Sequence, residues 1–193
     1  SSAASDVYKR QALFIWMLVH VIVLLISRIR SKSIFSLAFF GMLIAHLGIA
    51  VFVLGATVTT QLGIEKDIKM SVGESQNIAG YDFVFNGVSR HENNNYKGFK
   101  GDLTVLKNHK EVVRLYPEKR QYQTGMPMTE AAIDPSISRD LYVALGESLG
   151  GGAWGVRIYY KPLVRWIWLG GLMIALGALF AAIDRRYFLR IKS

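Results

Sequence analysis

Apolar residues along the chain gather in three long runs, Ala12 to Ile26, Ile34 to Val58 and Leu163 to Ile183. The second and third runs are long enough to cross a hydrocarbon core of about 30 Å, which takes roughly 20 helical residues. Their only ionisable side chains are His46 and, at one end, Arg165. The first run, of about 15 residues, favours a truncated or tilted span. The pattern therefore predicts three transmembrane helices.

Between Thr59 and Pro162 the long apolar runs give way to short alternating segments, which are typical of β-strands. The predicted strands are Tyr81 to Phe85, Asp102 to Leu106, Glu111 to Tyr116, Arg139 to Leu145 and Ala153 to Tyr160. Turns are predicted at Asn86-Gly87, at Lys107 to Lys110 and at Gly150 to Gly152, and residues 120–135, polar with two prolines, are predicted to be a surface loop. Frequent turns between short strands indicate a small β-sandwich or a partly open barrel.

The net charge of +9 does not belong to this β-rich region, where acidic and basic residues nearly cancel. The surplus lies beside the apolar runs, in the loop 27–33 and in the tail 184–193. Lys/Arg-rich short loops stay on the cytoplasmic side, whereas a nucleic-acid-binding protein concentrates basic residues on its folded domain. We therefore expect no nucleic-acid partner, a cytoplasmic loop and tail, and a β domain outside the cytoplasm, in the periplasm of a bacterium.

These patterns divide the chain into five segments. We expect a non-native leader at 1–11, two transmembrane helices in 12–58, a periplasmic β-rich domain at 59–162, a transmembrane helix at 163–183 and a cytoplasmic tail at 184–193. The fold class is thus a polytopic α-helical membrane protein fragment with three spans and an inserted all-β domain. The chain contains no cysteine, so no disulfide braces that domain.

His46 is the main candidate for chemistry. It lies about twelve residues into the second run, roughly 18 Å along the helix axis and so near the bilayer centre. The same helix carries a stripe of small residues, Gly41, Ala45, Gly48 and Gly55, which lets helices approach closely. One interpretation is a histidine hydrogen-bonded to a neighbouring helix. The other is a ligand or proton relay, because ionisable residues within membranes usually mark a site and imidazole binds haem iron well.

The other three histidines are weaker candidates. We place His20 near the cytoplasmic end of the first run, where it packs or meets water. His91 and His109 lie in polar, turn-like segments and are expected to be solvated. No Ser/His/Asp set, zinc spacing or phosphate-binding loop accompanies them.

Several separated motifs resemble, in order, the C-terminal part of the CcmF family, the haem lyase subunits of bacterial System I cytochrome c maturation. These motifs are Gly41 to Val51, Leu115 to Tyr122, Met128 to Asp134, Arg139 to Glu147, Tyr160 to Gly171 and Asp184 to Arg186. The resemblance covers nearly everything after Gln11, and an NrfE-like paralogue dedicated to nitrite reductase maturation shares much of it.

The resemblance implies an inner-membrane protein that takes haem from the chaperone CcmE. With CcmH and CcmI as partners, it attaches that haem to the CxxCH motif of apocytochrome c. It also implies haem b within the membrane, held by two histidines of which His46 matches one, with quinol as the candidate electron donor. The second ligand and the tryptophan-rich haem-handling segment are expected outside this chain, which alone is expected to be inactive. The alternative is a non-catalytic docking module for maturation partners, anchored by its spans in membrane lipid.

Overall fold

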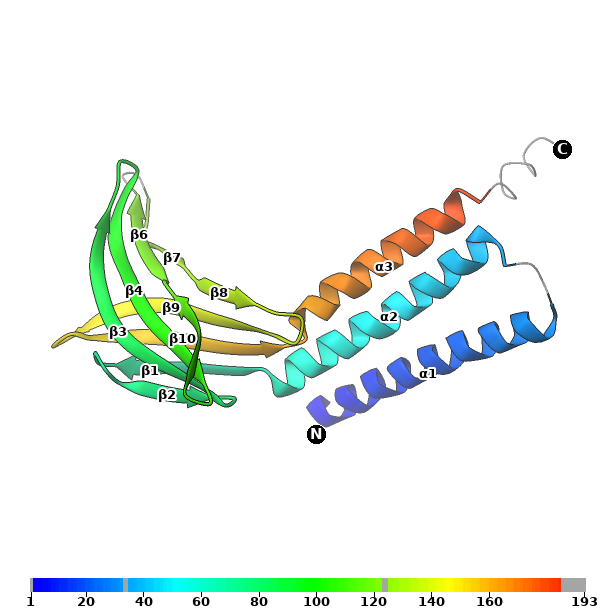
Figure 1. The fold of residues 1–193 in the computed structure, drawn as a ribbon, viewed down its shortest axis with the longest axis horizontal. Coiled ribbons are helices and arrows are strands. Elements are labelled where there is room, and N and C mark those ends of the chain that lie inside the picture. Colours follow the sequence, from blue (N-terminus) through cyan, green and yellow to red (C-terminus); the bar gives the residue numbers. More distant parts are fainter. Residues whose placement is uncertain (1, 33–34, 123–124, 185–193) are drawn as a thin grey trace. The chain divides into compact units, whose positions relative to one another are not determined.

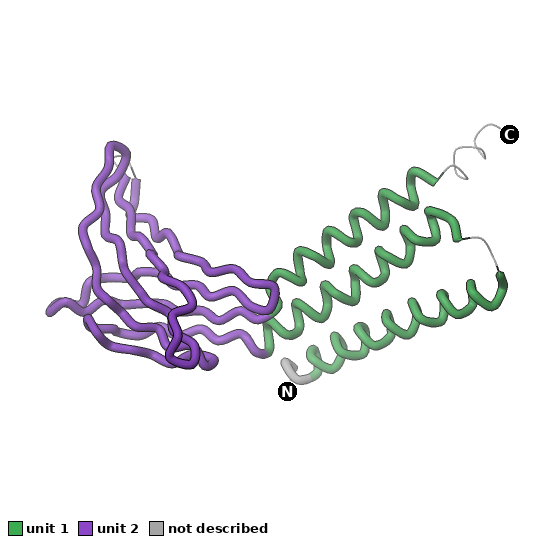
Figure 2. Tube along the Cα trace, in the orientation of Figure 1, with its two compact units in different colours: residues 1–61, 163–193 green, residues 62–162 purple. Residues whose placement is uncertain are grey.

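The computed structural model describes residues 2–32, 35–122 and 125–184. The chain divides into two compact units, one formed by Ser1–Gln61 with Leu163–Ser193 and the other by Leu62–Pro162 (Figure 2). Helices make up the first unit and strands the second, so the change of sequence pattern near residues 59 and 162 marks the structural boundary.

Unit 1 contains three helices, α1 (Ser2–Arg30), α2 (Leu37–Leu62) and α3 (Val164–Ala182) (Figure 1). All three are long and apolar enough to cross a membrane, which confirms the three predicted spans. The candidate span in α1 is 26 residues, Ser5–Arg30, and is therefore not the truncated segment that its apolar run suggested.

The N-terminal residues 2–11, assigned above to a leader, continue helix α1. Polar residues can continue a helix where the helix has no apolar face to bury. Here an ion pair of 3.2 Å between Asp6 and Lys9 links successive turns. At the other end of the chain only Asp184 of the expected tail is described, and it accepts a hydrogen bond from the backbone N–H of Ala38 at 2.7 Å. Residues 185–193, with the tail's basic side chains, lie outside the described residues.

Unit 2 is an antiparallel β-sandwich of two sheets. One sheet has the order β1-β10-β9-β8; the other has the order β2-β3-β4-β6-β7, with β5 also paired to β4. The strands are β1 (Ile64–Met70), β2 (Ser75–Ile78), β3 (Tyr81–Glu92), β4 (Tyr96–Lys107), β5 (Lys110–Leu115), β6 (Glu118–Tyr122), β7 (Met128–Glu130), β8 (Ala132–Pro135), β9 (Arg139–Gly150) and β10 (Ala153–Pro162).

Each predicted strand is present, and two predicted turns are confirmed. Asn108 and His109 have φ of 51° and 61°, as in a two-residue hairpin turn, and Gly150 to Gly152 all have positive φ between β9 and β10.

The predicted turn at Asn86-Gly87 is wrong. Strand β3 runs through it to Glu92, and the register with β4 shifts between Phe85 and Gly87, which is a β-bulge. The amide of Asn86 donates to Asp102 at 3.0 Å and Thr104 at 2.8 Å, so side chains secure the bulge.

The predicted loop at 120–135 is also wrong, because β6, β7 and β8 occupy most of it. These polar strands are stabilised by backbone pairing to β4 and β9 rather than by an apolar face of their own. The two prolines fit this arrangement: Pro127 lies between strands, and Pro135 is the last residue of β8, where a missing N–H costs little.

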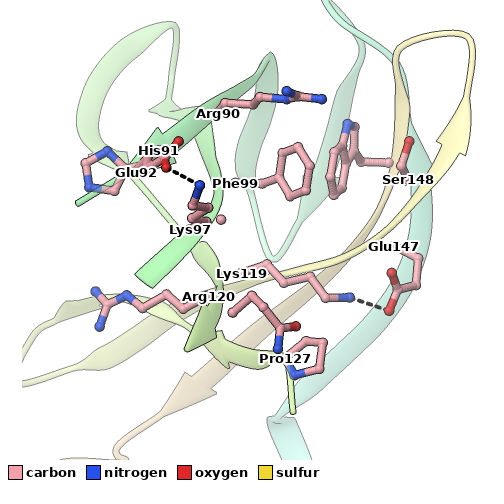
Figure 3. A pocket seen from close by; sticks show the side chains of 13 residues that line it. Arg90, His91, Glu92, Lys97, Phe99, Lys119, Arg120, Pro127, Glu147 and Ser148 are labelled. Carbon is pink, nitrogen blue, oxygen red and sulfur yellow. Dashed lines mark hydrogen bonds and ion pairs between the residues drawn. The ribbon is translucent and has the colours of Figure 1, made fainter. Parts of the chain in front are cut away.

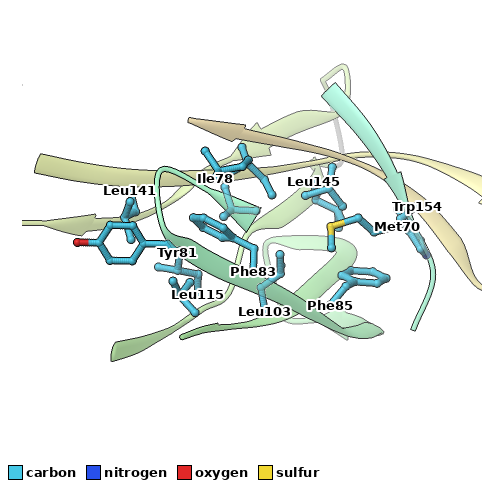
Figure 4. Close-up of a cluster of buried hydrophobic side chains, with 14 residues drawn as sticks. Met70, Ile78, Tyr81, Phe83, Phe85, Leu103, Leu115, Leu141, Leu145 and Trp154 are labelled. Carbon is cyan, nitrogen blue, oxygen red and sulfur yellow. The ribbon is translucent and has the colours of Figure 1, made fainter. Parts of the chain in front are cut away.

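The core of unit 2 lies between the two sheets (Figure 4). Alternate residues of β3 and β4 point inward, among them Phe83, Phe85 and Leu103, and they meet Leu141 and Leu145 of β9; all five are at most 1% exposed. Burial of this alternating set drives the two sheets together. It confirms the sandwich and explains why a domain without disulfides is compact.

Candidate functional site

Helices α2 and α3 approach each other along the predicted stripe of small residues. A Cβ added at Gly48 would come within 2.8 Å of the carbonyl oxygen of Gly170, and one added at Gly55 within 2.9 Å of the backbone nitrogen of Ile167. Real Cβ atoms do not come this close to backbone, so only glycine permits the contact. The glycines at 41, 48 and 55 recur every seven residues and keep this face of α2 against α3 along its length.

His46 projects from α2 and is half-buried. Its Nδ1 lies 2.8 Å from the carbonyl oxygen of Met42, one turn earlier. A carbonyl oxygen only accepts hydrogen bonds, so Nδ1 is the donor in this contact. In the tautomer whose one proton is on Nδ1, the opposite nitrogen Nε2 has the lone pair that binding a metal requires.

His20 on α1 lies against His46, contrary to the position expected for it. The centroids of the two imidazole rings are 5.3 Å apart with an interplanar angle of 29°, and His20 in turn stacks on Trp16 at 5.9 Å. His20 is ten residues before the end of α1, not beside the loop. One sequence signal pointed to this contact: His20 and His46 are nearly equidistant from the loop that joins α1 and α2, as facing residues of an antiparallel helix pair are.

The remaining histidines stay apart from this pair. His109 is exposed in the turn between β4 and β5. His91 on β3 is half-buried, with its ring 5.9 Å from that of Tyr96. Both belong to unit 2.

Unit 2 contains a buried polar cluster that the sequence did not single out. The hydroxyl of Tyr81 accepts hydrogen bonds from Lys107 and from Arg139, each at 3.2 Å, and Arg139 also pairs with Asp134. Burial alone would raise the pKa of Tyr81, but the two cationic donors outweigh it and hold that pKa below its usual value. The cluster joins β3 and β4 of one sheet to β8 and β9 of the other, so it secures the sandwich rather than forming a reactive site.

Fold and site together define a class: a membrane protein whose apolar helices carry two stacked histidines, with a β-sandwich inserted before the last helix. Residues 61–162 match the family described as the CcmF C-terminal beta-sandwich, and the chain belongs to this family.

Three relatives illustrate the match. The chain is 51% identical over 158 residues to the cytochrome c-type biogenesis protein CcmF of Pseudomonas fluorescens, covering 81% of this chain and 24% of the relative. It is 44% identical to CcmF of Escherichia coli, covering 93% of this chain and 28% of the relative. It is also 36% identical to NrfE of Haemophilus influenzae, covering 76% of this chain and 23% of the relative. The chain thus spans about a quarter of the length of the curated relatives that it matches.

A solved structure titled Cytochrome c Heme Lyase CcmF has the same fold. Its TM-score is 0.71 at 19% identity, over 89% of this chain and 29% of that one. The likeness supports a fold of three helices and an inserted β-sandwich.

Proposed function

We propose that this chain is the C-terminal part of a cytochrome c haem lyase, and that His46 is one axial ligand of haem b within the membrane. The observation that carries the proposal is the Nδ1 contact of His46 with Met42, which leaves Nε2 available in the middle of an apolar helix. The names of the relatives support the process, and the free imidazole nitrogen supports the cofactor.

The described residues fit one half of such a site. Hydrogen bonding of Nδ1 to a carbonyl oxygen fixes the ring orientation and increases the basicity of the opposite nitrogen, as carbonyl partners of metal-bound histidines do. His20 does not fit as the second ligand of the same iron, because ring nitrogens bind metal along their ring planes whereas the two rings meet face to face. The second ligand is therefore proposed to come from the part of the full-length protein outside this chain.

A bound haem b supplies one-electron transfer. In the proposed role, a haem b held by His46 would keep the iron of the haem being attached in its reduced form, with quinol as the electron donor. Residues of this chain contribute by holding and orienting: Met42 orients His46, and the ring of His20 supports the imidazole from one side.

Membership of the family supports a proposal for the wider process. Haem arrives from CcmE and is joined through thioether bonds to the CxxCH cysteines of apocytochrome c, with CcmH and CcmI as partners. The protein lies in the bacterial inner membrane with unit 2 in the periplasm. Since this chain holds neither the second ligand nor a catalytic constellation among its described residues, we propose that it is inactive without the rest of the protein.

A second function, docking of maturation partners, belongs to unit 2. This unit has its own core, and among its described residues we find no catalytic set. It also has a surface groove, which is described below. The two functions are compatible within one protein.

The test of haem ligation uses the full-length protein. In His46→Ala we expect loss of the reduced b-haem absorption spectrum and a fall in the yield of mature cytochrome c, because the ligand nitrogen is removed. His20→Ala removes only the stacked ring, so its spectrum is retained, and His109→Ala is the matched control in an exposed turn. An unchanged spectrum and yield in His46→Ala would contradict the proposal. If His20→Ala loses the haem, His20→Phe separates ligation from support, because it keeps a stacked ring without a ligand nitrogen: recovery of the spectrum shows support, and continued loss makes His20 a ligand.

A further inference from the structure

The inner face of the six-stranded sheet continues past the core and is left open at one end of unit 2. On β4 the inward row that contains Leu103 reaches Phe99 and Lys97. Phe99 is 37% exposed and Lys97 is also exposed, whereas Leu103 is fully buried. On β9 the inward row likewise passes from buried Leu145 to exposed Glu147. A surface that faces the core elsewhere is thus open to solvent here.

This open end forms a hollow of about 510 Å³ with an aromatic wall (Figure 3). The ring of Phe99 lies 5.1 Å from that of Trp154 on β10, at an interplanar angle of 56°. Trp154 is only 9% exposed and belongs to the core cluster, so packing in the core fixes this side of the wall. Preorganised aromatic surfaces of this kind anchor apolar side chains at interfaces.

Cations outnumber acids around the hollow. Its lining contains four Lys or Arg side chains and two Glu side chains, although the charges of unit 2 as a whole nearly cancel. Both acids are already engaged: Glu92 pairs with Lys97 at 2.6 Å, and Glu147 pairs with Lys119. Within each ion pair the two charges cancel, which leaves Arg90 and Arg120 as the remaining cations of the lining.

These two arginines differ in their partners. Arg120 is held by Glu118 at 2.8 Å and lies over the ring of Tyr96. Arg90 on β3 is exposed, and among the residues that the structure describes no carboxylate pairs with it. The labelled side chain of Arg90 extends on the same side of the hollow as Phe99 (Figure 3). Arg90 is therefore the cation that is available to an incoming anion.

Tyr96 and Tyr122 lie on the opposite face of the same sheet, because Tyr96 alternates with the inward Lys97 and pairs with Tyr122. Their rings are 5.5 Å apart and line a separate hollow of about 280 Å³. The first hollow thus combines its aromatic wall with Arg90, and aromatic residues and arginine are enriched where proteins bind one another.

Along β1 and β10, the groove lies at the opposite end from Ile64 and Tyr160. Trp154 pairs with Met70, whereas Ile64 and Tyr160, next to the junctions with α2 and α3, pair six residues further along β1 and β10. This separation is roughly 20 Å along the strands.

We propose that this hollow, the groove of unit 2, binds an acidic segment of a partner protein. An aromatic side chain of the segment packs against Phe99 and Trp154, and a neighbouring carboxylate pairs with Arg90. The proposal deepens the docking role given above and rests on it.

The probe is a fluorescein-labelled synthetic decapeptide with one Trp flanked by Glu residues in a Gly/Ser background, titrated with the whole chain in detergent by fluorescence anisotropy. We expect saturable binding that weakens about tenfold when Trp is replaced by Ser or Glu by Lys. Arg90→Glu weakens binding of the Glu peptide about tenfold and strengthens binding of the Lys peptide, because the charge is exchanged. Phe99→Ala weakens binding of both.

Arg114→Glu is the matched control: it makes the same change of net charge at an exposed residue of β5 outside the groove, and it leaves binding unchanged. The proposal is overturned if the unaltered chain does not bind the peptide. It is also overturned if Arg90→Glu and Arg114→Glu weaken peptide binding equally, because that result shows attraction by overall charge alone. Haem ligation is scored separately. In the full-length protein Arg90→Glu retains the reduced b-haem spectrum, and His46→Ala in this chain retains peptide binding.

Discussion

At the scale of single residues, hydrogen-bond partners determine what each titratable side chain is able to do. The carbonyl of Met42 accepts a hydrogen bond from Nδ1 of His46, so Nε2 is the nitrogen that would bind a metal. In unit 2, Glu118 accepts hydrogen bonds from the hydroxyl of Tyr96 at 2.9 Å and from Arg120 at 2.8 Å. Burial would raise the pKa of Glu118, but these two donors outweigh it and lower that pKa.

This lowered pKa predicts a pH dependence of stability. The ionised form of Glu118 is favoured in the folded state, so its contribution is fully present above the unfolded pKa of about 4.3 and is lost as pH falls through the lower folded pKa. Glu118→Gln is expected to destabilise unit 2 by about 1 kcal/mol at pH 7 and to flatten the loss of stability between about pH 5 and pH 3. The measurement is thermal unfolding followed by the β-sheet circular dichroism signal.

Glu111→Gln is the control for this experiment. Glu111 forms an exposed pair with Arg114, with both side chains about half exposed, so its substitution should change stability by less than about 0.5 kcal/mol. Equal acid sensitivity of the unaltered chain and Glu118→Gln would show that Glu118 does not contribute as described.

At the scale of elements, a short glycine pattern decides how two spans pack. Gly170 and Gly171 are neighbours in α3, but they point to different surroundings. A Cβ at Gly170 would come within 2.6 Å of the carbonyl oxygen of Gly48, whereas a Cβ at Gly171 would meet nothing within 4 Å.

This difference predicts opposite outcomes for the same substitution one residue apart. Gly170→Leu forces α2 and α3 apart and should lower the thermal stability of the helical unit by about 2 kcal/mol or more, since overpacking a tight contact costs roughly 1–3 kcal/mol. Gly171→Leu should be neutral within about 0.5 kcal/mol. Helical circular dichroism of the detergent-solubilised chain during heating provides the measurement, and equal effects of the two substitutions would rule out the close helix contact.

At the scale of the whole molecule, the proposed topology places unit 2 and the α1–α2 connection on opposite sides of the membrane. The absence of native cysteine gives a clean background for labelling with a membrane-impermeant maleimide. Lys110→Cys, exposed at the start of β5, should be labelled in intact spheroplasts, and Ser31→Cys only after the membrane is permeabilised. Labelling of Ser31→Cys alone in intact spheroplasts would invert the topology and remove unit 2 from the periplasm.

The amino-acid sequence by itself determined the features that depend on local pattern. Three apolar runs predicted three spans, alternation predicted the strands that carry the core, and the turn at Asn108 and His109 followed from its residue types. His46 stood out because an ionisable residue within an apolar run is rare. These predictions need only neighbouring residues, since burial in lipid or in a core imposes a regular period.

Only the tertiary structure decided the features that depend on residues distant in the chain. Strands β6 to β8 form because β4 and β9 offer backbone partners, and Asn86-Gly87 is a bulge because β4 continues alongside it. The stacking of His20 on His46, and the groove beside Phe99 and Arg90, likewise arise where separate elements meet. Backbone hydrogen bonds and side-chain contacts can form with any strand or helix that folding brings near. The residues of one segment therefore do not show which distant segment will be its partner.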